Sequence, residues 1–302
     1  MTAVDIVIVT YNSEETIDSA VEQLVGVDSV TVIVVDNAST DATVERLRSL
    51  PVETIALEEN GGFAHGCNVG WRAGDAPYVL FLNPDARIGA EAVEALAAEL
   101  DRDERVGAVA PRIEEPDGSL DYSLRRSPRL RSSFAQALFL HRIFPEATWV
   151  DEVIRDPAAY EHPHAVEWVS GACFAVRRTV LEELGGLDES FFHYSEDVDI
   201  CERIRRSGRE VRFVPAARAE HEGGASAPRA RLLPILAASR IRYSAKHDSP
   251  PVVLALRASV ALGAATHVVL ARSAEARRGH LRALGVALRP LPAEPSRLVR
   301  GT

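Results

Sequence analysis

The sequence predicts an α/β protein with a mostly parallel sheet flanked by helices, followed by a helical carboxyl-terminal extension. Three observations lead to this fold class. Apolar runs rich in Val and Ile alternate with amphipathic stretches over the first third of the 302 residues. Polar residues gather directly after these runs, and a long apolar stretch beside basic residues occupies the carboxyl-terminal part. Buried strands that alternate with helices are typical of a parallel sheet covered on both faces.

The first part of the chain contains the clearest alternation of strand and helix patterns. We expect strands at Ile6–Val9, Val30–Val35, Val52–Leu57, Val79–Leu82 and Val106–Ala110. We expect helices at Glu15–Val25, at Asp41–Leu50, from the Asn60–Gly61–Gly62 loop to Ala73, and at Ala90–Leu100. Right-handed crossovers should connect the parallel strands.

The pattern weakens between Arg112 and Val166, where we expect a lid or a partner-binding insert. Four clustered arginines lie in this segment, namely Arg125, Arg126, Arg129 and Arg131. They could meet the phosphate of an acceptor, or they could form only a solvated surface. Regular structure should return at a strand over Trp168–Val176, a helix over Arg178–Leu184 and a strand over Val211–Val214.

An acidic helix start is expected between the last two of these elements. Ser195 is placed to cap the helix, and its first turn holds three carboxylates, Glu196, Asp197 and Asp199. Such charges complement a helix dipole, but three of them beside aromatic residues are costly and indicate a chemical site. His221 follows the final strand in a polar, glycine-containing loop, and it could be a ligand or a structural histidine.

The net charge of −10 hides an uneven distribution. From Leu236 to the end there are eleven Lys and Arg against three Asp and Glu, a net charge of +8, so the remainder carries −18. A nucleic-acid-binding protein would carry its basic patch on the folded domain, and that class is therefore disfavoured. The basic tail fits either a contact with an anionic membrane surface or a solvated helix.

Cysteine usage and apolar stretches bear on the location of the protein. Cys67, Cys173 and Cys201 lie far apart without a Cys-x-x-Cys motif, which disfavours disulfides and zinc and favours a reducing compartment. The chain opens on a strand pattern, so no signal peptide is expected. The longest apolar stretch, Pro251–Leu270, contains one arginine and one histidine; it should be a poor membrane span but could lie in the interface.

Polar side chains follow the first four expected strands at their carboxyl ends, where open α/β sheets bind ligands. They are Thr10 and Asn12, Asp36, Asn60, and Asp85. Asp85 follows Asn83–Pro84, and it could hold a divalent cation or belong to an ordinary turn. The chain lacks Gly-x-Gly-x-x-Gly after its first strand and lacks Gly-x-x-x-x-Gly-Lys, which disfavours dinucleotide-binding and P-loop enzymes.

Five short motifs occur in a fixed order along the chain. They are Val7–Asn12, Val34–Asp41, Glu59–Ala64 with Asn68 and Gly70, Phe81–Asp85, and Glu196–Asp197 with His221. This ordered set, spread over residues 4–224, resembles the family 2 glycosyltransferases and especially their rhamnosyltransferase-like branch. The resemblance implies a GT-A fold with a Rossmann-like sheet. It also implies inverting transfer from a nucleoside-diphosphate sugar, usually with Mg²⁺ or Mn²⁺.

The resemblance further implies roles for individual residues. Asp36 would accept the N3–H of uracil or thymine. The other nucleotide-binding residues would be Thr10, Asn12, Asn60, Gly61 and Asn83. Asp85 and His221 would bind the metal, and Asp197 would be the catalytic base with Glu196 beside it. Asn83–Pro84–Asp85 stands where many relatives carry Asp-x-Asp, so a single metal carboxylate remains and metal affinity should be modest.

We therefore expect a glycosyltransferase domain over residues 1–234 and a basic helical extension over residues 235–302. Residues 1–111 would form the nucleotide-sugar half of the domain, and residues 112–234 the acceptor and catalytic half. The extension could contact a membrane or pack in a homodimer.

The leading functional hypothesis is a metal-dependent, inverting hexosyltransferase of cell wall polysaccharide synthesis. The favoured donor is dTDP-rhamnose, with a UDP-sugar as the alternative, and the acceptor is a polyprenyl-linked or cell-surface glycan. The rival hypothesis is an inactive module that binds a nucleotide sugar or a partner. The retained Asp197 argues against it, because binding alone needs no base. A cytoplasmic location is expected, with peripheral contact to the inner face of the plasma membrane left open.

Overall fold

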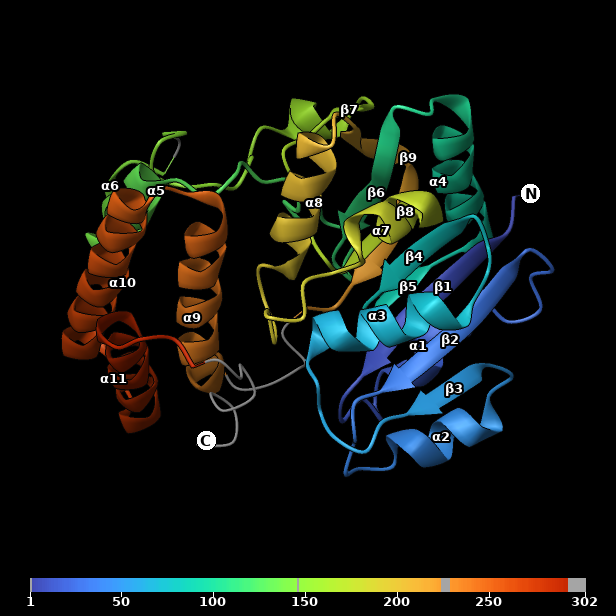
Figure 1. The fold of residues 1–302 in the computed structure, drawn as a ribbon, viewed down its shortest axis with the longest axis horizontal. Coiled ribbons are helices and arrows are strands. Elements are labelled where there is room, and N and C mark those ends of the chain that lie inside the picture. Colours follow the sequence, from blue (N-terminus) through green and yellow to red (C-terminus); the bar gives the residue numbers. More distant parts are fainter. Residues whose placement is uncertain (1, 146, 224–228, 293–302) are drawn as a thin grey trace. The chain divides into compact units, whose positions relative to one another are not determined.

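The computed structural model of the protein describes residues 2–145, 147–223 and 229–292 (Figure 1). The chain forms two compact units. The sheet unit comprises Met1–Arg125, Asp156–Glu189 and Glu196–Ser226, and the helical unit comprises Arg126–Arg155, Ser190–Ser195 and Ala227–Thr302. This division differs from a boundary at residue 234, because the insert of residues 126–155 packs with the carboxyl-terminal helices rather than with the sheet.

The sheet unit is built on one mixed sheet. Its strands are β1 (Val4–Thr10), β2 (Val30–Asp36), β3 (Glu53–Ala56), β4 (Tyr78–Leu82), β5 (Ala86–Ile88), β6 (Val106–Glu114), β7 (His164–Ala165), β8 (Cys173–Arg177) and β9 (Glu210–His221). Their order is β3-β2-β1-β4-β8-β6-β9-β5, and β7 pairs with β9. The α/β class is thereby confirmed.

The first four strands pair in parallel, β1 with β2 and β4 and β2 with β3, and β6 also pairs in parallel with β9. The strand expected at Val106–Ala110 is β6, and it does not extend that set directly. Strand β8 separates it from β4 and runs antiparallel to both. The short strand β5 has no counterpart among the expected elements, since three residues carry too little periodicity to be recognised.

Helices flank the sheet at the expected positions, although several are shorter or longer than expected. They are α1 (Ile17–Val21), α2 (Thr43–Ser49), α3 (Phe63–Ala73), α4 (Ala90–Arg102), α7 (Arg178–Leu184) and α8 (Glu196–Arg206), with a 3₁₀ turn η1 (Pro157–Tyr160). Helix α3 packs against β1 and β2. Gly70 permits this close approach, because a Cβ there would lie 2.3 Å from Val7 Cγ1.

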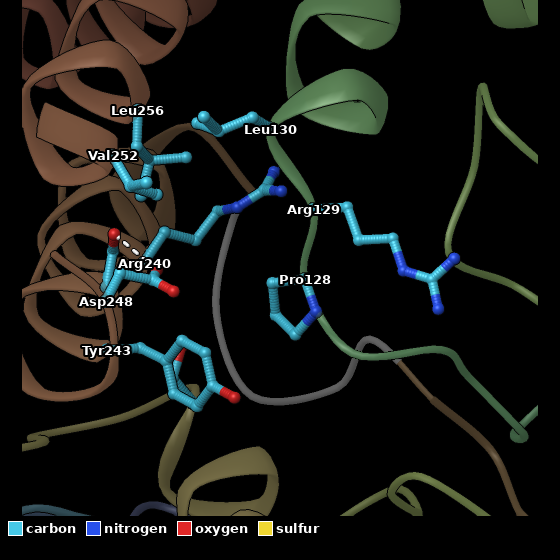
Figure 2. Close-up of a pocket in the computed structure, with 10 residues that line it drawn as sticks. Pro128, Arg129, Leu130, Arg240, Tyr243, Asp248, Val252 and Leu256 are labelled. Atoms are coloured by element: carbon cyan, nitrogen blue, oxygen red, sulfur yellow. Dashed lines mark hydrogen bonds between the residues drawn. The ribbon is translucent and has the colours of Figure 1, made fainter.

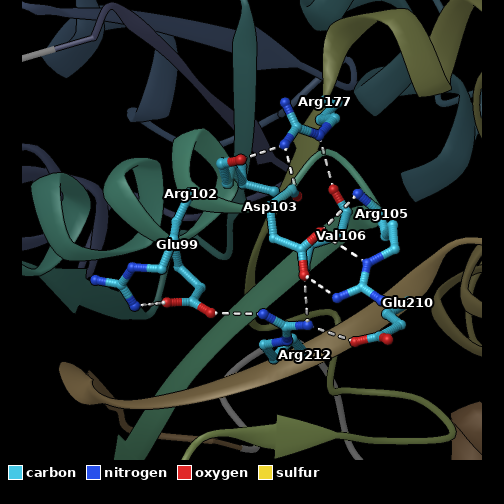
Figure 3. A network of polar contacts seen from close by, with 9 residues as sticks. Glu99, Arg102, Asp103, Arg105, Val106, Arg177, Glu210 and Arg212 are labelled. Atoms are coloured by element: carbon cyan, nitrogen blue, oxygen red, sulfur yellow. Dashed lines mark hydrogen bonds and ion pairs between the residues drawn. The ribbon is translucent and has the colours of Figure 1, made fainter.

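A network of hydrogen bonds and ion pairs connects α4 to the starts of β6 and β9 and to β8 (Figure 3). Arg212 on β9 donates to Glu99 Oε1 at 2.8 Å and to Asp103 Oδ2 at 3.1 Å. Arg177 on β8 donates to the carbonyl oxygens of Val106 and Asp103. Hydrogen bonds and charge from Arg105, with help from Arg212, hold the pKa of Asp103 well below its usual range. The network joins α4 to three strands.

The helical unit contains α5 (Leu130–Ala137), α6 (Leu140–Ile143), α9 (Arg229–His247), α10 (Pro250–Leu270) and α11 (Ala274–Leu288). Helix α10 packs against α5, α9 and α11 around a small apolar core that includes Ala237, Ala264 and Ala283. The expected helical carboxyl-terminal region is confirmed. By length and composition, α10 is also apolar enough to cross a membrane, despite its arginine and histidine.

Candidate functional site

The carboxyl ends of β1 and β2 hold Asp36 in a fixed orientation. Thr10 and Asp36 are paired across the two strands, and Thr10 Oγ1 donates to Asp36 Oδ1 at 2.9 Å. Ser39 donates to the same carboxylate twice, from Oγ to Oδ1 at 2.6 Å and from its backbone N–H to Oδ2 at 2.9 Å. Asp36 is only 1% exposed. Oδ2 therefore retains acceptor capacity for one further donor, while Oδ1 is engaged by two hydroxyls.

Asn12 fastens the loops that follow these strands. Its backbone N–H donates to Ser39 Oγ at 2.8 Å, and its Oδ1 accepts from the Thr40 N–H at 2.8 Å. Asn12 and Ala38 both have left-handed φ values, 53° and 59°, which turn the two loops sharply. Tyr11 lies between these anchored positions and is 45% exposed. An exposed aromatic ring at this edge could stack on a base, a role that composition and spacing alone did not assign.

The glycine loop before α3 forms the next part of the same edge. Asn60 Oδ1 accepts from the Gly62 N–H at 2.9 Å, and Asn37 Nδ2 donates to the Gly62 carbonyl at 3.1 Å. Gly62 has a φ of 90°, and a Cβ on Gly61 would lie 2.4 Å from a ring atom of His65. Gly62 thus requires glycine for its backbone conformation, and a side chain at position 61 would displace the His65 ring. Asn60 stabilises the loop itself, because its side-chain oxygen accepts a hydrogen bond from the Gly62 N–H of the same loop.

Asn37 is a site residue that the motif alone did not single out. It is 3% exposed, and its Oδ1 has no hydrogen-bond partner among the described residues. Such an orphaned buried acceptor is costly unless a ligand donor reaches it. The signal in the sequence was only its place after Asp36.

Asp85 and His221 are brought together by β5 and β9. Asn83 begins the connecting turn, with the Ala86 N–H donating to its carbonyl at 3.1 Å, and Ala86 pairs with His221 across the strands. His221 Nε2 then lies 3.2 Å from Asp85 Oδ1. Asn83 itself is held by a bond from its N–H to the Ala172 carbonyl at 2.9 Å. A residue far along the chain is thereby placed against the predicted metal carboxylate.

This pair fits a divalent cation. The buried Asp85 Oδ1 makes no hydrogen bond of ordinary geometry with a described residue. Burial lowers the pKa of His221, but Asp85, Asp121 and Glu115 outweigh it and raise that pKa overall, as expected of an imidazole in a negative field. No group of three His, Cys, Asp or Glu side chains suited to a metal occurs among the described residues. Two protein ligands leave the remaining coordination to water and phosphate oxygens, as Mg²⁺ commonly prefers.

Asp197 lies in the first turn of helix α8, and its carboxylate is fixed by backbone donors. Oδ2 accepts from the Gly171 N–H at 3.0 Å, and Oδ1 accepts from the Val198 N–H at 2.8 Å. Burial raises the pKa of this carboxyl above its ordinary value; the two backbone N–H groups and the charge of Arg125 counteract only part of that effect. A half-buried, oriented carboxylate with a raised pKa suits a general base.

The neighbouring acids have different environments. Glu196 is 4% exposed, and its charge adds to the burial that raises the pKa of the Cys67 thiol, so it lies toward α3. Asp199 is fully buried and forms an ion pair with Arg203 Nε at 2.8 Å. Arg203 also donates to the carbonyls of Leu184 and Gly186. Of the three acids, Asp199 is thus structural, and Asp197 is the most accessible.

The start of α8 differs from the expected cap. Tyr194 and Ser195 both have a φ of 69°, whereas an N-cap residue ordinarily has an extended backbone. Two consecutive non-glycine residues in the left-handed region are costly, and such positions concentrate at functional sites. The expectation of an ordinary serine cap was wrong in its geometry, although the helix begins where expected.

The arginine cluster is divided between the two units. Arg125 belongs to the sheet unit, where its guanidinium lies 5.7 Å from the centre of the Trp168 ring and acts on Asp197 by its charge. Arg126, Arg129 and Arg131 belong to the helical unit. The segment therefore contributes one cation beside the candidate base and others to a separate surface.

The helical unit contains a pocket of about 320 Å³ (Figure 2). It is lined by Pro128, Arg129, Leu130, Ser195, Arg240, Tyr243, Ser244, Asp248, Val252 and Leu256. Arg240 reaches across the helices to Ser133 Oγ at 2.9 Å and Glu152 Oε1 at 3.2 Å, so it is firmly oriented. The lining thus combines apolar walls with both basic and acidic side chains, a composition that suits an amphiphile.

The predicted residues thus fall into three groups. Thr10, Asn12 and Asp36 join with the Asn60–Gly61 loop through direct or shared hydrogen bonds, and Asp85 meets His221. Asp197 accepts a hydrogen bond from the Gly171 N–H, and the carbonyl of the next residue, Ala172, accepts one from the Asn83 N–H. All three groups belong to the sheet unit. Together they contain the residues predicted to bind the nucleoside, to hold the cation and to act as the base.

Comparisons with known proteins identify the family of the chain. A family model described as glycosyl transferase family 2 matches residues 5–185, more than half of the chain. The chain is 33% identical over 205 residues to N-acetylglucosaminyl-diphospho-decaprenol L-rhamnosyltransferase of Mycobacterium tuberculosis, over 64% of this chain and 66% of that protein. It is 28% identical to Rhamnosyltransferase WbbL of Escherichia coli, over 53% of this chain and 60% of that protein. Each match covers less than two thirds of the relative's length.

Among solved structures, the chain resembles mannosyltransferase PcManGT from Pyrobaculum calidifontis in complex with GDP-Man and Mn²⁺. The TM-score is 0.55 at 23% identity, and the match covers 94% of this chain and 79% of that one. This likeness concerns the fold, and it confirms the expected GT-A architecture. The chain therefore belongs to glycosyl transferase family 2, and its sequence is similar to the rhamnosyltransferases of that family.

Proposed function

We propose that this protein is an inverting glycosyltransferase that moves rhamnose from dTDP-rhamnose to a lipid-linked glycan in cell wall polysaccharide synthesis. The observation that carries the proposal is Asp197, a carboxylate oriented by two backbone N–H groups with a raised pKa. Similarity to rhamnosyltransferases, one of them named for a diphospho-decaprenol-linked substrate, supports the choice of sugar and acceptor. The three buried free cysteines are consistent with a cytoplasmic reaction at the inner face of the plasma membrane.

The nucleoside of the donor binds at the carboxyl ends of β1 and β2. Asp36 Oδ2 accepts the N3–H of thymine, a donor that uracil shares, and the exposed ring of Tyr11 stacks on the base. Thr10 and Asn12 act mainly by orienting Asp36 and the loops, as their hydrogen bonds indicate. Asn37 Oδ1 and the tight Asn60–Gly61 loop face the remaining part of the nucleotide sugar. There the buried Asn37 Oδ1 accepts a hydrogen bond from a hydroxyl or amide group of the ligand.

Asp85 and His221 hold Mg²⁺ or Mn²⁺, with Asn83 positioning the turn that carries Asp85. The close approach of the Asp85 carboxylate to the His221 imidazole supports this assignment. When bound, the cation neutralises the charge that develops on the leaving diphosphate. A single carboxylate ligand predicts modest affinity for the free ion, because phosphate oxygens must supply much of the coordination.

Asp197 removes the proton from the acceptor hydroxyl as that oxygen attacks the anomeric carbon. The new carbon–oxygen bond forms as the bond to the diphosphate breaks, and the nucleoside diphosphate leaves with the electron pair of that bond. A single displacement inverts the anomeric configuration. Gly171 keeps Asp197 in position during the transfer, and Glu196 supports the helix start from its buried place.

The acceptor occupies the pocket of the helical unit with its lipid-proximal phosphate. Leu130, Val252 and Leu256 provide apolar walls, and Arg240 provides positive charge while it pairs with Glu152 and shares the lining with Asp248. Ser195 also lines this pocket.

A thermal-shift screen of nucleotide sugars with Mn²⁺, followed by transfer assays, tests the proposal. The active enzyme should be stabilised by dTDP-rhamnose above other donors, by RT ln(1 + [L]/Kd) for each ligand. It should then release dTDP and form an inverted linkage that NMR can assign. Stabilisation without release of dTDP, with or without a polyprenyl-diphosphate-linked acceptor, would instead favour a module that only binds the nucleotide sugar.

A further inference from the structure

Helix α10 presents an unbroken apolar stripe to solvent. The exposed positions recur at intervals of three and four residues, which places them on one face of the helix. They are Pro251, Leu254, Ala258, Leu262, Ala265 and Val269. Leu254 is 71% exposed and Val269 is 79% exposed. A contiguous apolar face of this length is unusual on a water-exposed helix and marks an interaction surface.

The polar side chains of α10 are turned inward, toward the helical unit. Arg257 donates to the carbonyls of Val286 and Arg289, at the end of α11. Thr266 Oγ1 donates to the Ala137 carbonyl at 3.0 Å, and Ser259 Oγ donates to the Leu256 carbonyl at 2.8 Å. The packing face of the helix thus combines these polar groups with the buried Leu256 and Ala264, whereas its exposed face is apolar. A water-soluble surface helix instead exposes a polar face.

Positive charge accompanies this stripe. Helix α11, which packs against α10, exposes Arg277, Arg278 and Arg282, and the connecting and following segments expose Arg272 and Arg289. None of these five arginines forms an ion pair with another described residue. An apolar helix face next to unpaired basic side chains is the combination that binds an anionic lipid surface.

We propose that α10 docks the helical unit onto an anionic membrane, lying in the interface with its apolar stripe against the acyl chains. A spanning orientation fits less well, because it would carry the arginines of the packed helix α11 into the hydrocarbon. A second copy of the chain fits less well too, because pairing two stripes would bring two basic surfaces together. This inference goes beyond sugar transfer and does not depend on it, since a protein that only bound nucleotide sugars could dock in the same way.

Flotation of the full-length, nucleotide-free protein with vesicles tests the proposal. Vesicles of phosphatidylcholine containing about one third phosphatidylglycerol should carry the protein upward, and pure phosphatidylcholine should carry less. The triple variant Leu254→Glu, Leu262→Glu, Val269→Glu should lower the bound fraction at least about tenfold, because three side chains that would be buried among the acyl chains become charged. The matched control Gln23→Glu, Val25→Glu, Thr31→Glu alters exposed residues of the sheet unit by the same charge and should float like the wild type.

Two further measurements make the outcome decisive. Circular dichroism should show that the glutamate variant is folded; if it is not, serine at the same three positions gives the same test without added charge. Raising the salt concentration should weaken binding by screening the arginines. The proposal is overturned if the wild type ignores anionic vesicles or if the folded stripe variant floats as well as the wild type. Without vesicle binding, a wild-type dimer that this variant dissociates would assign the stripe to self-association.

Discussion

His221 Nε2 lies 3.2 Å from Asp85 Oδ1 across the antiparallel pair of β5 and β9. This contact places an imidazole and a carboxylate, two ordinary ligands of divalent cations, at the edge of the sheet where β4 ends. Strand β5 is responsible for the convergence, because it turns back from Asp85 and pairs with the last strand of the sheet unit.

Asp85→Asn should abolish most of the metal dependence of nucleotide binding. The amide keeps the size of the side chain but removes the negative charge that attracts the cation. Titration calorimetry should show that the gain in dTDP affinity on adding Mn²⁺ falls at least about tenfold. Tenfold is the smaller loss typical of residues that only support a metal ligand, and Asp85 is itself a proposed ligand. Glu222→Gln, an exposed acid next to His221, is the matched control. Equal dTDP affinity with Mn²⁺ and with EDTA in the wild type would contradict the assignment.

Asp197→Asn should leave donor binding intact and lower turnover by ~10²–10⁴-fold, the usual cost of losing a general base. The amide can still accept one backbone hydrogen bond, but it cannot take a proton. Glu196→Gln should have a smaller effect, because that side chain is buried toward α3. Steady-state rates of dTDP release measure both. The reverse result, an active Asp197→Asn and a dead Glu196→Gln, would move the base to Glu196.

Arg125→Gln should shift the acid side of the pH profile of kcat/KM to higher pH. Asp197 acts only when it is ionised, and burial already raises its pKa. The charge of Arg125 lowers that pKa, so removing it raises the pKa further and protonates the base at a higher pH. Arg131→Gln removes the same charge from an exposed position of the helical unit and should leave the limb in place. An unmoved limb in Arg125→Gln would show that Arg125 does not act on the base.

Asp36→Asn should weaken the binding of dTDP and UDP, because the amide can present an N–H to the N3–H of the base. Loss of a hydrogen bond to a charged group costs about 1.5–3 kcal/mol, or roughly a tenfold to hundredfold rise in Kd. GDP, whose base presents different groups, should lose less. Asp18→Asn, an exposed acid in α1, controls for the change in charge. Equal losses for all three nucleotides would point to general disruption of the loops rather than base recognition.

Leu130→Glu should raise the KM for a polyprenyl-diphosphate-linked acceptor at least about tenfold, because a carboxylate would repel the acceptor phosphate in an enclosed site. The KM for the donor should stay unchanged, since the donor residues lie in the sheet unit. Leu236→Glu introduces the same charge on an exposed part of α9 outside the pocket. If both variants behave alike, the pocket does not hold the acceptor.

Much of the nucleotide half follows from local sequence alone. The continuous Val and Ile runs of β1, β2 and β4 specify buried parallel strands, because only a sheet covered on both faces can hide them. Thr10 and Asp36 end β1 and β2, and Asp85 lies three residues beyond β4, so the strands themselves set their place at one edge. The sequence also predicted the glycine loop before α3. The structure explains these glycines by the left-handed φ of Gly62 and the close approach of Gly61 to His65.

The remaining features depend on contacts between distant parts of the chain. No local pattern distinguishes Asp199 from Asp197. Asp199 forms an ion pair with Arg203, and Arg203 is held in place by its hydrogen bond to the Leu184 carbonyl of α7. The insert of residues 126–155 joined the carboxyl-terminal helices rather than the sheet because α5 found its apolar partner in α10. The sequence by itself determined that α10 is apolar. Only the tertiary structure decided that its polar side chains face inward, since hydrogen bonds to α5 and α11 outweigh their exposure to water and leave the apolar stripe outside.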